Sequence, residues 1–285
     1  MAKEKKMPKE YAIIVSLAIF FSVVTIVGSF RLYLLTKTET TALDLNNIDV
    51  VETDTNIDMA SYNLRITNAI RQKYDIDIYY GDEINVQSVN AVPLTDENEI
   101  FNMLREVNEV LEEYPQDLIR EMEQKGYEIS IYLVSYFTTE AEALANRNSI
   151  GQMKIYISNT INVKRALHHE YYHILDYYIR LETDERLAYL NWDKYNPKGF
   201  EYTEDINNIT SKYVYEGEPD AYFVTPYAKF SEKEDRAETF AEMLTASKME
   251  SFFEQGPIKG KIDIIKKVLF NTFNCVRTSK TLAWQ

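Results

Sequence analysis

The chain has 285 residues and a formal net charge of −14, from 31 lysines and arginines against 45 aspartates and glutamates. An acidic field of this size argues against a nucleic-acid partner, because contacts with phosphates need a basic surface. One cysteine and eight glycines exclude an internal disulfide and argue against a glycine-rich nucleotide-binding loop.

The first predicted element is a membrane anchor. Residues 11–30 are twenty consecutive residues without a charge, and a helix of that length spans about 30 Å, one bilayer core. The run follows four lysines, Lys3, Lys5, Lys6 and Lys9. The positive-inside rule therefore predicts a cytoplasmic segment 1–10, a single-pass anchor 11–35 and an extracellular remainder. A cleaved signal peptide is the alternative, but its apolar region is normally only about 7–15 residues long.

A polar tether and one folded domain are predicted to follow the anchor. Residues 36–55 are rich in threonine, asparagine and acidic residues and lack an apolar pattern. Residues 56–285 are enough for one domain with a full core. Because a lone cysteine does not suit a disulfide-building secretory route, we expect the cell surface of a Gram-positive bacterium.

The pattern of apolar residues predicts an α+β domain. Helices are expected at residues 59–74 and 96–114, around a short strand at 76–80, and a further helix ends near Gly126. Two alternating runs, 128–135 and 152–158, predict strands of a small mixed sheet. An active-site helix (161–181), an irregular insertion (182–230) and a helical C-terminal part that ends with 258–275 complete the order.

The strongest chemical signal lies in the helix predicted at 161–181. All three histidines fall between His168 and His173, and within this run His169-Glu170-Tyr171-Tyr172-His173 follows the HExxH pattern. Residues four apart share one helix face, so two imidazoles can bind one Zn²⁺ while Glu170 takes the proton of a water. The pattern indicates a zinc hydrolase, most often a peptidase. The alternative is a core helix with incidental polar residues.

A hydrolytic zinc site needs a third protein ligand and an open position for water. The metzincin pattern would place glycine and histidine at the third and sixth positions after the second histidine, but Asp176 and Ile179 stand there. That class is excluded, and a carboxylate is expected because no further histidine follows His173. We assign Glu238, which interrupts the apolar stripe of a helix with a predicted N-cap at Ser231, since an acid facing a core needs a partner.

Two alternatives for these acidic residues stay open. The helix that contains Glu238 could be a solvated acidic helix, an interpretation that fits Glu232, Glu234 and Glu242 better than Glu238. Asp193, twenty residues after the second histidine, is a rival third ligand, because thermolysin-like enzymes place a glutamate near there. Its surroundings look like a loop, which favours Glu238.

Three stretches, residues 169–176, 227–228 and 234–241, resemble bacterial zinc-binding metallopeptidases related to anthrax lethal factor and the Pro-Pro endopeptidases. In that group, HExxHxxD carries two histidine ligands and the general base, and a glutamate in an AETF-like segment of a later helix is the third ligand. The resemblance implies ligands at His169, His173 and Glu238, a base at Glu170 and a supporting role, such as orienting a ligand, for Asp176.

The resemblance has one departure, which concerns a catalytic tyrosine. The relatives have this tyrosine seven residues before the glutamate ligand, and counted from Glu238 that position is Ser231. Tyr227, eleven residues before Glu238, could replace it only if the intervening loop folds back. Its hydroxyl would then stabilise the oxyanion.

These observations together predict a membrane-anchored extracellular zinc metalloendopeptidase with a zincin-like fold, one Zn²⁺ per chain and a peptide or protein substrate. In zincins the strand before the active-site helix lies along the cleft edge, so residues 153–158 are expected to pair with substrate, although an interior strand is an equal alternative. Two other classes stay open: an inactive zincin-fold surface binding module, and a zinc hydrolase of a non-peptide cell-wall substrate. The intact Glu170 argues against the first.

Overall fold

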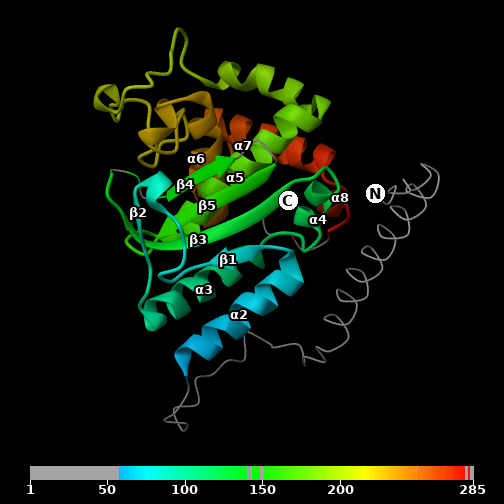
Figure 1. Cartoon of the computed structure of the whole chain (residues 1–285). Helices are drawn as coiled ribbons and strands as arrows, with labels where there is room; N and C mark the ends of the chain where they lie inside the picture. Colours follow the sequence, from blue (N-terminus) through cyan, green and yellow to red (C-terminus); the bar gives the residue numbers. More distant parts are fainter. Residues whose placement is uncertain are drawn as a thin grey trace, which may run out of the picture. The chain divides into compact units, whose positions relative to one another are not determined.

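The computed structural model describes residues 58–139, 141, 143–147, 151–248, 250–279 and 282 (Figure 1). By its contacts the chain divides into two units, Met1–Val51 and Glu52–Gln285, and the second contains all the described elements. The predicted cytoplasmic segment, anchor and tether lie outside the described residues. None of the helices in the described part combines the length and apolar character that crossing a membrane requires.

A mixed β-sheet forms one layer of the second unit. Its main path runs β1 (Asp77–Tyr79), β3 (Glu128–Phe137), β5 (Gln152–Ser158) and β4 (Ala143–Arg147), and β2 (Ala91–Pro93) also pairs with β3. β1 and β5 run parallel to β3, whereas β2 and β4 are antiparallel to their partners. The predicted small mixed sheet and its strands are thus confirmed.

The prediction that residues 153–158 form the substrate-docking edge of the sheet is wrong. β5 lies between β3 and β4, with Ile155 paired to Ile131 on one side and to Ala145 on the other. β4 is the edge strand instead. It escaped the sequence pattern because its residues, Ala-Leu-Ala-Asn-Arg, include few of the β-branched and aromatic types that favour strands.

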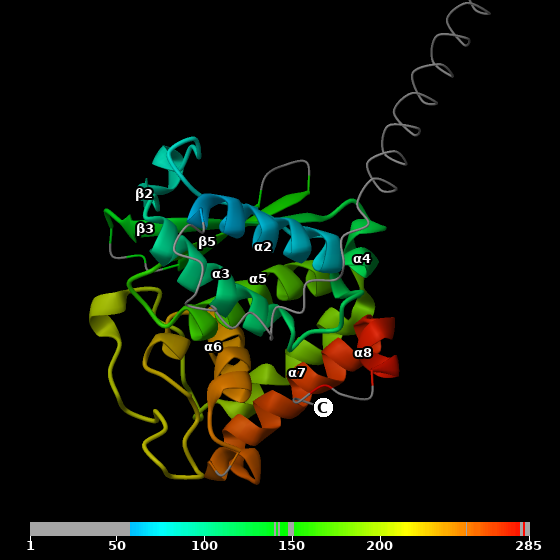
Figure 2. The ribbon, with the colours of Figure 1, turned by 90° about the horizontal axis from the view of Figure 1, so that it is seen from below.

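The two faces of the sheet have different partners. Along β3, Ile129, Ile131 and Leu133 are buried, and by the alternation of a strand they share one face. Figure 2 shows α3 (Glu97–Leu111), α5 (Val163–Glu182) and α6 (Glu232–Thr245) together on one side of the sheet. The other face carries a smaller apolar cluster, made by Val86, Val89, Val134, Phe137 and Tyr156.

The remaining helices agree with the predicted order, with one exception. α2 (Met59–Tyr74) and α4 (Leu118–Glu123) precede the long strand β3. The helix predicted at 258–275 is two helices, α7 (Gly256–Thr272) and α8 (Asn274–Thr278), because the backbone is extended at Phe273. Phe273 is buried there and stacks on Tyr178 of α5, with ring centroids 5.4 Å apart.

The insertion between α5 and α6 is irregular, as predicted, apart from three 3₁₀ segments: η3 (Asp184–Tyr195), η4 (Ile206–Asn208) and η5 (Tyr227–Lys229). α6 begins after Ser231, whose hydroxyl accepts a hydrogen bond from the backbone N–H of Glu234 at 3.3 Å. The predicted N-cap is therefore confirmed. It fixes the first turn of α6 directly after η5, and both segments contribute to the site described below.

A buried charge pair fixes α6 against α7. The ammonium group of Lys261 donates a hydrogen bond to the Asp235 carboxylate at 2.7 Å, and both side chains are fully buried. The same carboxylate oxygen accepts hydrogen bonds from Trp192 and Tyr202, each at 2.8 Å. A buried charge is tolerated when it is paired and hydrogen-bonded in this way. The network therefore sets the position of α6.

Candidate metal centre

Two imidazoles of α5 lie side by side. His169 and His173 are one helical turn apart, and their Nε2 atoms are 3.0 Å from each other. The side chain of His169 is buried, whereas 20% of the His173 side chain is exposed. The HExxH pattern therefore produces the expected pair on one helix face, at a place that solvent reaches.

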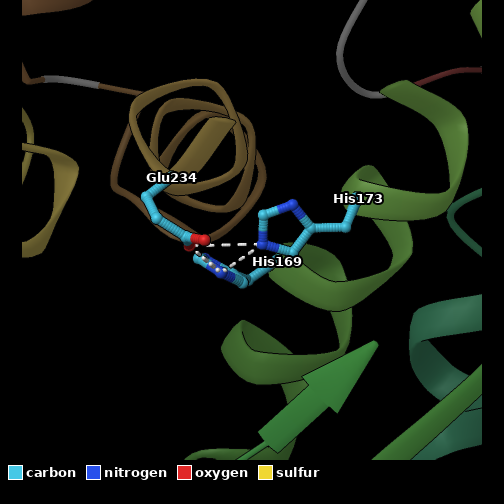
Figure 3. Close-up of side chains that lie close together, drawn as sticks. All are labelled: His169, His173 and Glu234. Atoms are coloured by element: carbon cyan, nitrogen blue, oxygen red, sulfur yellow. Dashed lines mark hydrogen bonds and ion pairs between the residues drawn. The ribbon is translucent and has the colours of Figure 1, made fainter. Parts of the chain in front are cut away.

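A carboxylate from α6 completes a triangle with these nitrogens (Figure 3). Glu234 Oε2 lies 3.1 Å from Nε2 of His169 and 3.2 Å from Nε2 of His173. We call these three atoms the ligand triangle. Tetrahedral zinc with bonds of about 2.0–2.1 Å separates neighbouring ligand atoms by about 3.3–3.4 Å. The triangle therefore fits one Zn²⁺ with little adjustment, and the described residues contain no other such group of histidine, cysteine or acidic ligands.

Glu238, the ligand assigned from the sequence, does not lie on this side of the imidazole. Its Oε1 atom is 2.7 Å from Nδ1 of His169, the nitrogen that faces away from the ligand triangle. Glu234 and Glu238 are one turn apart and share a face of α6. Both therefore face α5, and the offset of one helix along the other decides which reaches Nε2. The position of α6 along α5 cannot be predicted from the periodicity of the sequence.

The protonation chemistry of the triangle also suits a cation. The carboxylate of Glu238 lies 2.7 Å from Nδ1 of His169, which favours a proton on that nitrogen and leaves Nε2 for a second proton or a cation. Nε2 faces the Glu234 carboxylate, which only accepts hydrogen bonds. Burial alone would lower the pKa of His169, but contacts with Glu234 and Glu238 raise it to about 10. Burial alone would raise the pKa of Glu234, but the histidines lower it to about 2. The ligand triangle thus stabilises positive charge.

Glu170, the predicted base, is buried next to the ligand triangle. Burial raises the pKa of its carboxyl, and the two histidines oppose this rise. Its carboxylate also accepts a hydrogen bond from the backbone N–H of Ala145 in the edge strand β4. The residue therefore lies between the histidines and the sheet edge.

Tyr227 also lies at the site. It belongs to η5, its ring centroid is 6.2 Å from that of His169, and 38% of the residue is exposed. Its ring stacks on Phe230 with centroids 5.6 Å apart. Burial raises the pKa of its hydroxyl, and the charges of Glu234, Glu170 and Glu238 raise it further, so the hydroxyl keeps its proton.

Asp176 of α5 forms an ion pair with Arg236 of α6. Its two carboxylate oxygens accept hydrogen bonds from Nε and Nη2 of Arg236, each at 3.0 Å, and both side chains are buried. Arg236 also pairs with Glu232 in its own helix and lies over the ring of Tyr189. Asp176 therefore joins α5 to α6, the two helices that carry the ligand triangle.

Two further residues, Asp193 and His168, lie outside the ligand triangle. Asp193 is exposed in η3, where it accepts a hydrogen bond from Asn196 at 3.4 Å, and it is not part of the ligand triangle. His168 is buried, with Nδ1 2.7 Å from the Tyr114 hydroxyl, so the third histidine belongs to the core. Sequence reasoning missed Glu234 as a site residue. One signal could have found it: Tyr227 stands seven residues before it.

Comparisons with known proteins identify the family of the chain. A family model described as "Putative zinc-binding metallo-peptidase" matches residues 58–261, which include α5, η5 and α6. No curated protein matches the chain significantly. Among solved structures, the chain is similar to the crystal structure of a putative zinc-binding metallo-peptidase from Bacteroides caccae. The two share 20% sequence identity and a TM-score of 0.48 over 79% of this chain and 92% of that chain.

Proposed function

Because the chain belongs to the family of putative zinc-binding metallo-peptidases, we propose that it is a zinc-dependent endopeptidase that binds one Zn²⁺ through His169, His173 and Glu234. The observation that carries this proposal is the ligand triangle, whose edges of 3.0, 3.1 and 3.2 Å suit tetrahedral zinc. Three protein ligands leave the fourth position for water, as hydrolytic zinc sites require.

In this proposal Glu170 is the general base. Bound zinc supplies a Lewis acid that polarises the scissile carbonyl and makes water more acidic. Glu170 takes the proton of the attacking water and passes it to the leaving amine. Its buried position raises the pKa of its carboxyl, which favours uptake of a proton. The N–H of Ala145 orients the carboxylate.

Tyr227 is proposed to stabilise the oxyanion. Its hydroxyl keeps its proton, and its ring lies 6.2 Å from that of His169, so it is available as a donor near the ligand triangle. With Glu234 as the ligand, the tyrosine stands seven residues before the glutamate, the spacing of lethal factor and the Pro-Pro endopeptidases. The departure noted when counting from Glu238 disappears, which supports the HExxH type and the relation to lethal factor.

Peptide substrate is proposed to bind along β4. This strand ends the sheet in the described part of the chain, and the N–H of its central residue, Ala145, already points to Glu170. An extended peptide that adds to this edge would bring its scissile bond next to the base. The uncharged run at 11–30 supports an extracellular domain anchored in the cell membrane.

The first test is the zinc content of the purified full-length chain, together with cleavage of a mixed peptide library. We expect about one zinc per chain and cleavage that a chelator abolishes and added zinc restores. A chain that binds no zinc after reconstitution would overturn the proposal. Zinc binding without peptide cleavage would leave the binding module or the hydrolase of a non-peptide wall substrate.

A further inference from the structure

Glu238 has a partner that the proposed function does not use, Arg165. Arg165 lies in the first turn of α5, four residues before His169. Its Nη2 donates to Glu238 Oε2 at 2.7 Å, and its Nη1 lies 3.4 Å from Glu238 Oε1. The side chain of Arg165 is 28% exposed and that of Glu238 is 6% exposed, so the contact is largely shielded from water.

We propose that Arg165 is a positioning residue of the metal centre: it holds the Glu238 carboxylate on Nδ1 of His169 and away from the metal. This inference rests on the proposed function, since it concerns the same ligand triangle. Without a restraint, two glutamates one turn apart on α6 compete for one cation. Arg165 resolves that competition in favour of Glu234.

The contacts of Glu238 account for both of its oxygens. Oε2 accepts hydrogen bonds from Arg165 and from the Thr225 hydroxyl, the latter at 2.6 Å. Oε1 lies 2.7 Å from Nδ1 of His169. A carboxylate held in this way by Arg165 and Thr225 cannot turn toward Nε2 without breaking a charge-assisted hydrogen bond, which is the stronger kind. The Glu234 carboxylate, by contrast, contacts only the two imidazoles among the residues that the structure describes.

The charges around the ligand triangle also favour Glu234 over Glu238 as the metal ligand. Two carboxylates, Glu234 and Glu170, balance the double charge of a zinc ion. Glu238 would add a third negative charge next to them, and Arg165 neutralises it. Glu242, one turn further along α6, is a weaker partner, with its carboxylate oxygen 3.6 Å from Nη2 of Arg165. If Arg165 is removed, the nearly buried Glu238 keeps only a hydroxyl and an imidazole, and the metal becomes its most favourable counter-ion.

The test uses Arg165→Met and Arg165→Lys in the full-length chain, with Arg120→Met as the matched control. Arg120 lies in α4 and pairs with Asp75 at 2.6 Å, outside the ligand triangle. We expect Arg165→Met to weaken zinc binding about 10–100-fold in a chelator competition assay, as loss of a supporting contact typically does. Arg165→Lys should recover part of this loss, and Arg120→Met should bind like the parent chain.

Two readouts separate positioning from a general effect on folding. The visible spectrum of the cobalt-substituted protein should change in Arg165→Met, because Glu238 enters the coordination sphere. In a double-mutant cycle, Arg165→Met should add no further loss of zinc affinity once Glu238→Gln is present, since Arg165 acts through that carboxylate. Additive losses would overturn the proposal.

The outcomes also separate this inference from the proposed function. If the parent chain binds no zinc, the proposed function fails and this inference fails with it. If the parent binds zinc and Arg165→Met binds it within threefold, with an unchanged cobalt spectrum, only this inference fails. Should Arg165→Met not fold, judged by thermal unfolding of the metal-free protein, Thr225→Val and Arg165→Lys decide by the same two measurements. Parent-like values in both variants would contradict the positioning role.

Discussion

Glu234 and Glu238 stand one turn apart on α6 and contact opposite nitrogens of one imidazole. Glu234 Oε2 is 3.1 Å from Nε2 of His169, whereas Glu238 Oε1 is 2.7 Å from Nδ1. In the proposed site, these two carboxylates of the same helix face would have different tasks: one would complete the ligand triangle, and the other would support the ring from its opposite side.

This division of tasks predicts different results for the two alanine variants. Glu234→Ala removes a direct ligand and should lose most of the bound zinc, whereas Glu238→Ala should keep the metal with an affinity lowered by about 10–100-fold. Metal analysis after dialysis and chelator competition measure both quantities. Zinc retained in Glu234→Ala and lost in Glu238→Ala would instead support the ligand assigned from the sequence.

Replacing the proposed base should separate binding from turnover. Glu170→Gln keeps the size of the side chain and leaves the ligand triangle unchanged, so zinc content should match that of the parent. Peptide cleavage should fall by a factor of about 10²–10⁴, the usual contribution of a positioned acid or base. Parent-like cleavage in a variant with full zinc content would show that another group moves the proton.

Tyr227→Phe removes only the proposed oxyanion donor. The value of kcat should fall about 10²–10³-fold, because the hydrogen bond matters most in the transition state. Zinc content and KM should change little. The control is Tyr136→Phe, which alters an exposed tyrosine of β3. If both variants lose activity to the same small degree, Tyr227 has no special part in the reaction.

The Lys261–Asp235 pair should matter for stability. Lys261→Met leaves the fully buried carboxylate of Asp235 without its cation, and breaking such a pair costs about 3–5 kcal/mol in the free energy of unfolding. The matched control on the same helix is Lys259→Met. Lys259 pairs with Asp263 in a more exposed position, where the expected change is less than about 1 kcal/mol. Denaturant unfolding of both variants compares them, and similar losses would contradict the argument.

The sequence predicted those parts of the site that depend on local geometry. The pairing of His169 with His173, the position of Glu170 beside them and the N-cap at Ser231 all follow from helix spacing, and the structure contains each of them. Most helices and strands also followed from apolar periodicity, because their buried faces repeat at regular intervals.

The remaining features depend on how elements pack against each other. The offset of α6 along α5 brings Glu234 instead of Glu238 to Nε2, and that offset is set by contacts such as the one between Asp176 and Arg236. The edge strand β4 went unrecognised because neighbouring strands, and not its own composition, hold it in the sheet. Neither feature can be predicted from the spacing of residues along the sequence.

The ligand triangle also has a mechanical consequence. It draws one atom from residue 234 and two from α5, so that a metal would join positions 65 residues apart along the chain. A cation that binds only the folded chain stabilises it by about 2.7 kcal/mol when its free concentration is about 100 times the dissociation constant. Cys275 has no second cysteine to pair with. Zinc would therefore join α5 to α6 by a link that a chelator can remove, in a chain whose single cysteine offers no internal disulfide.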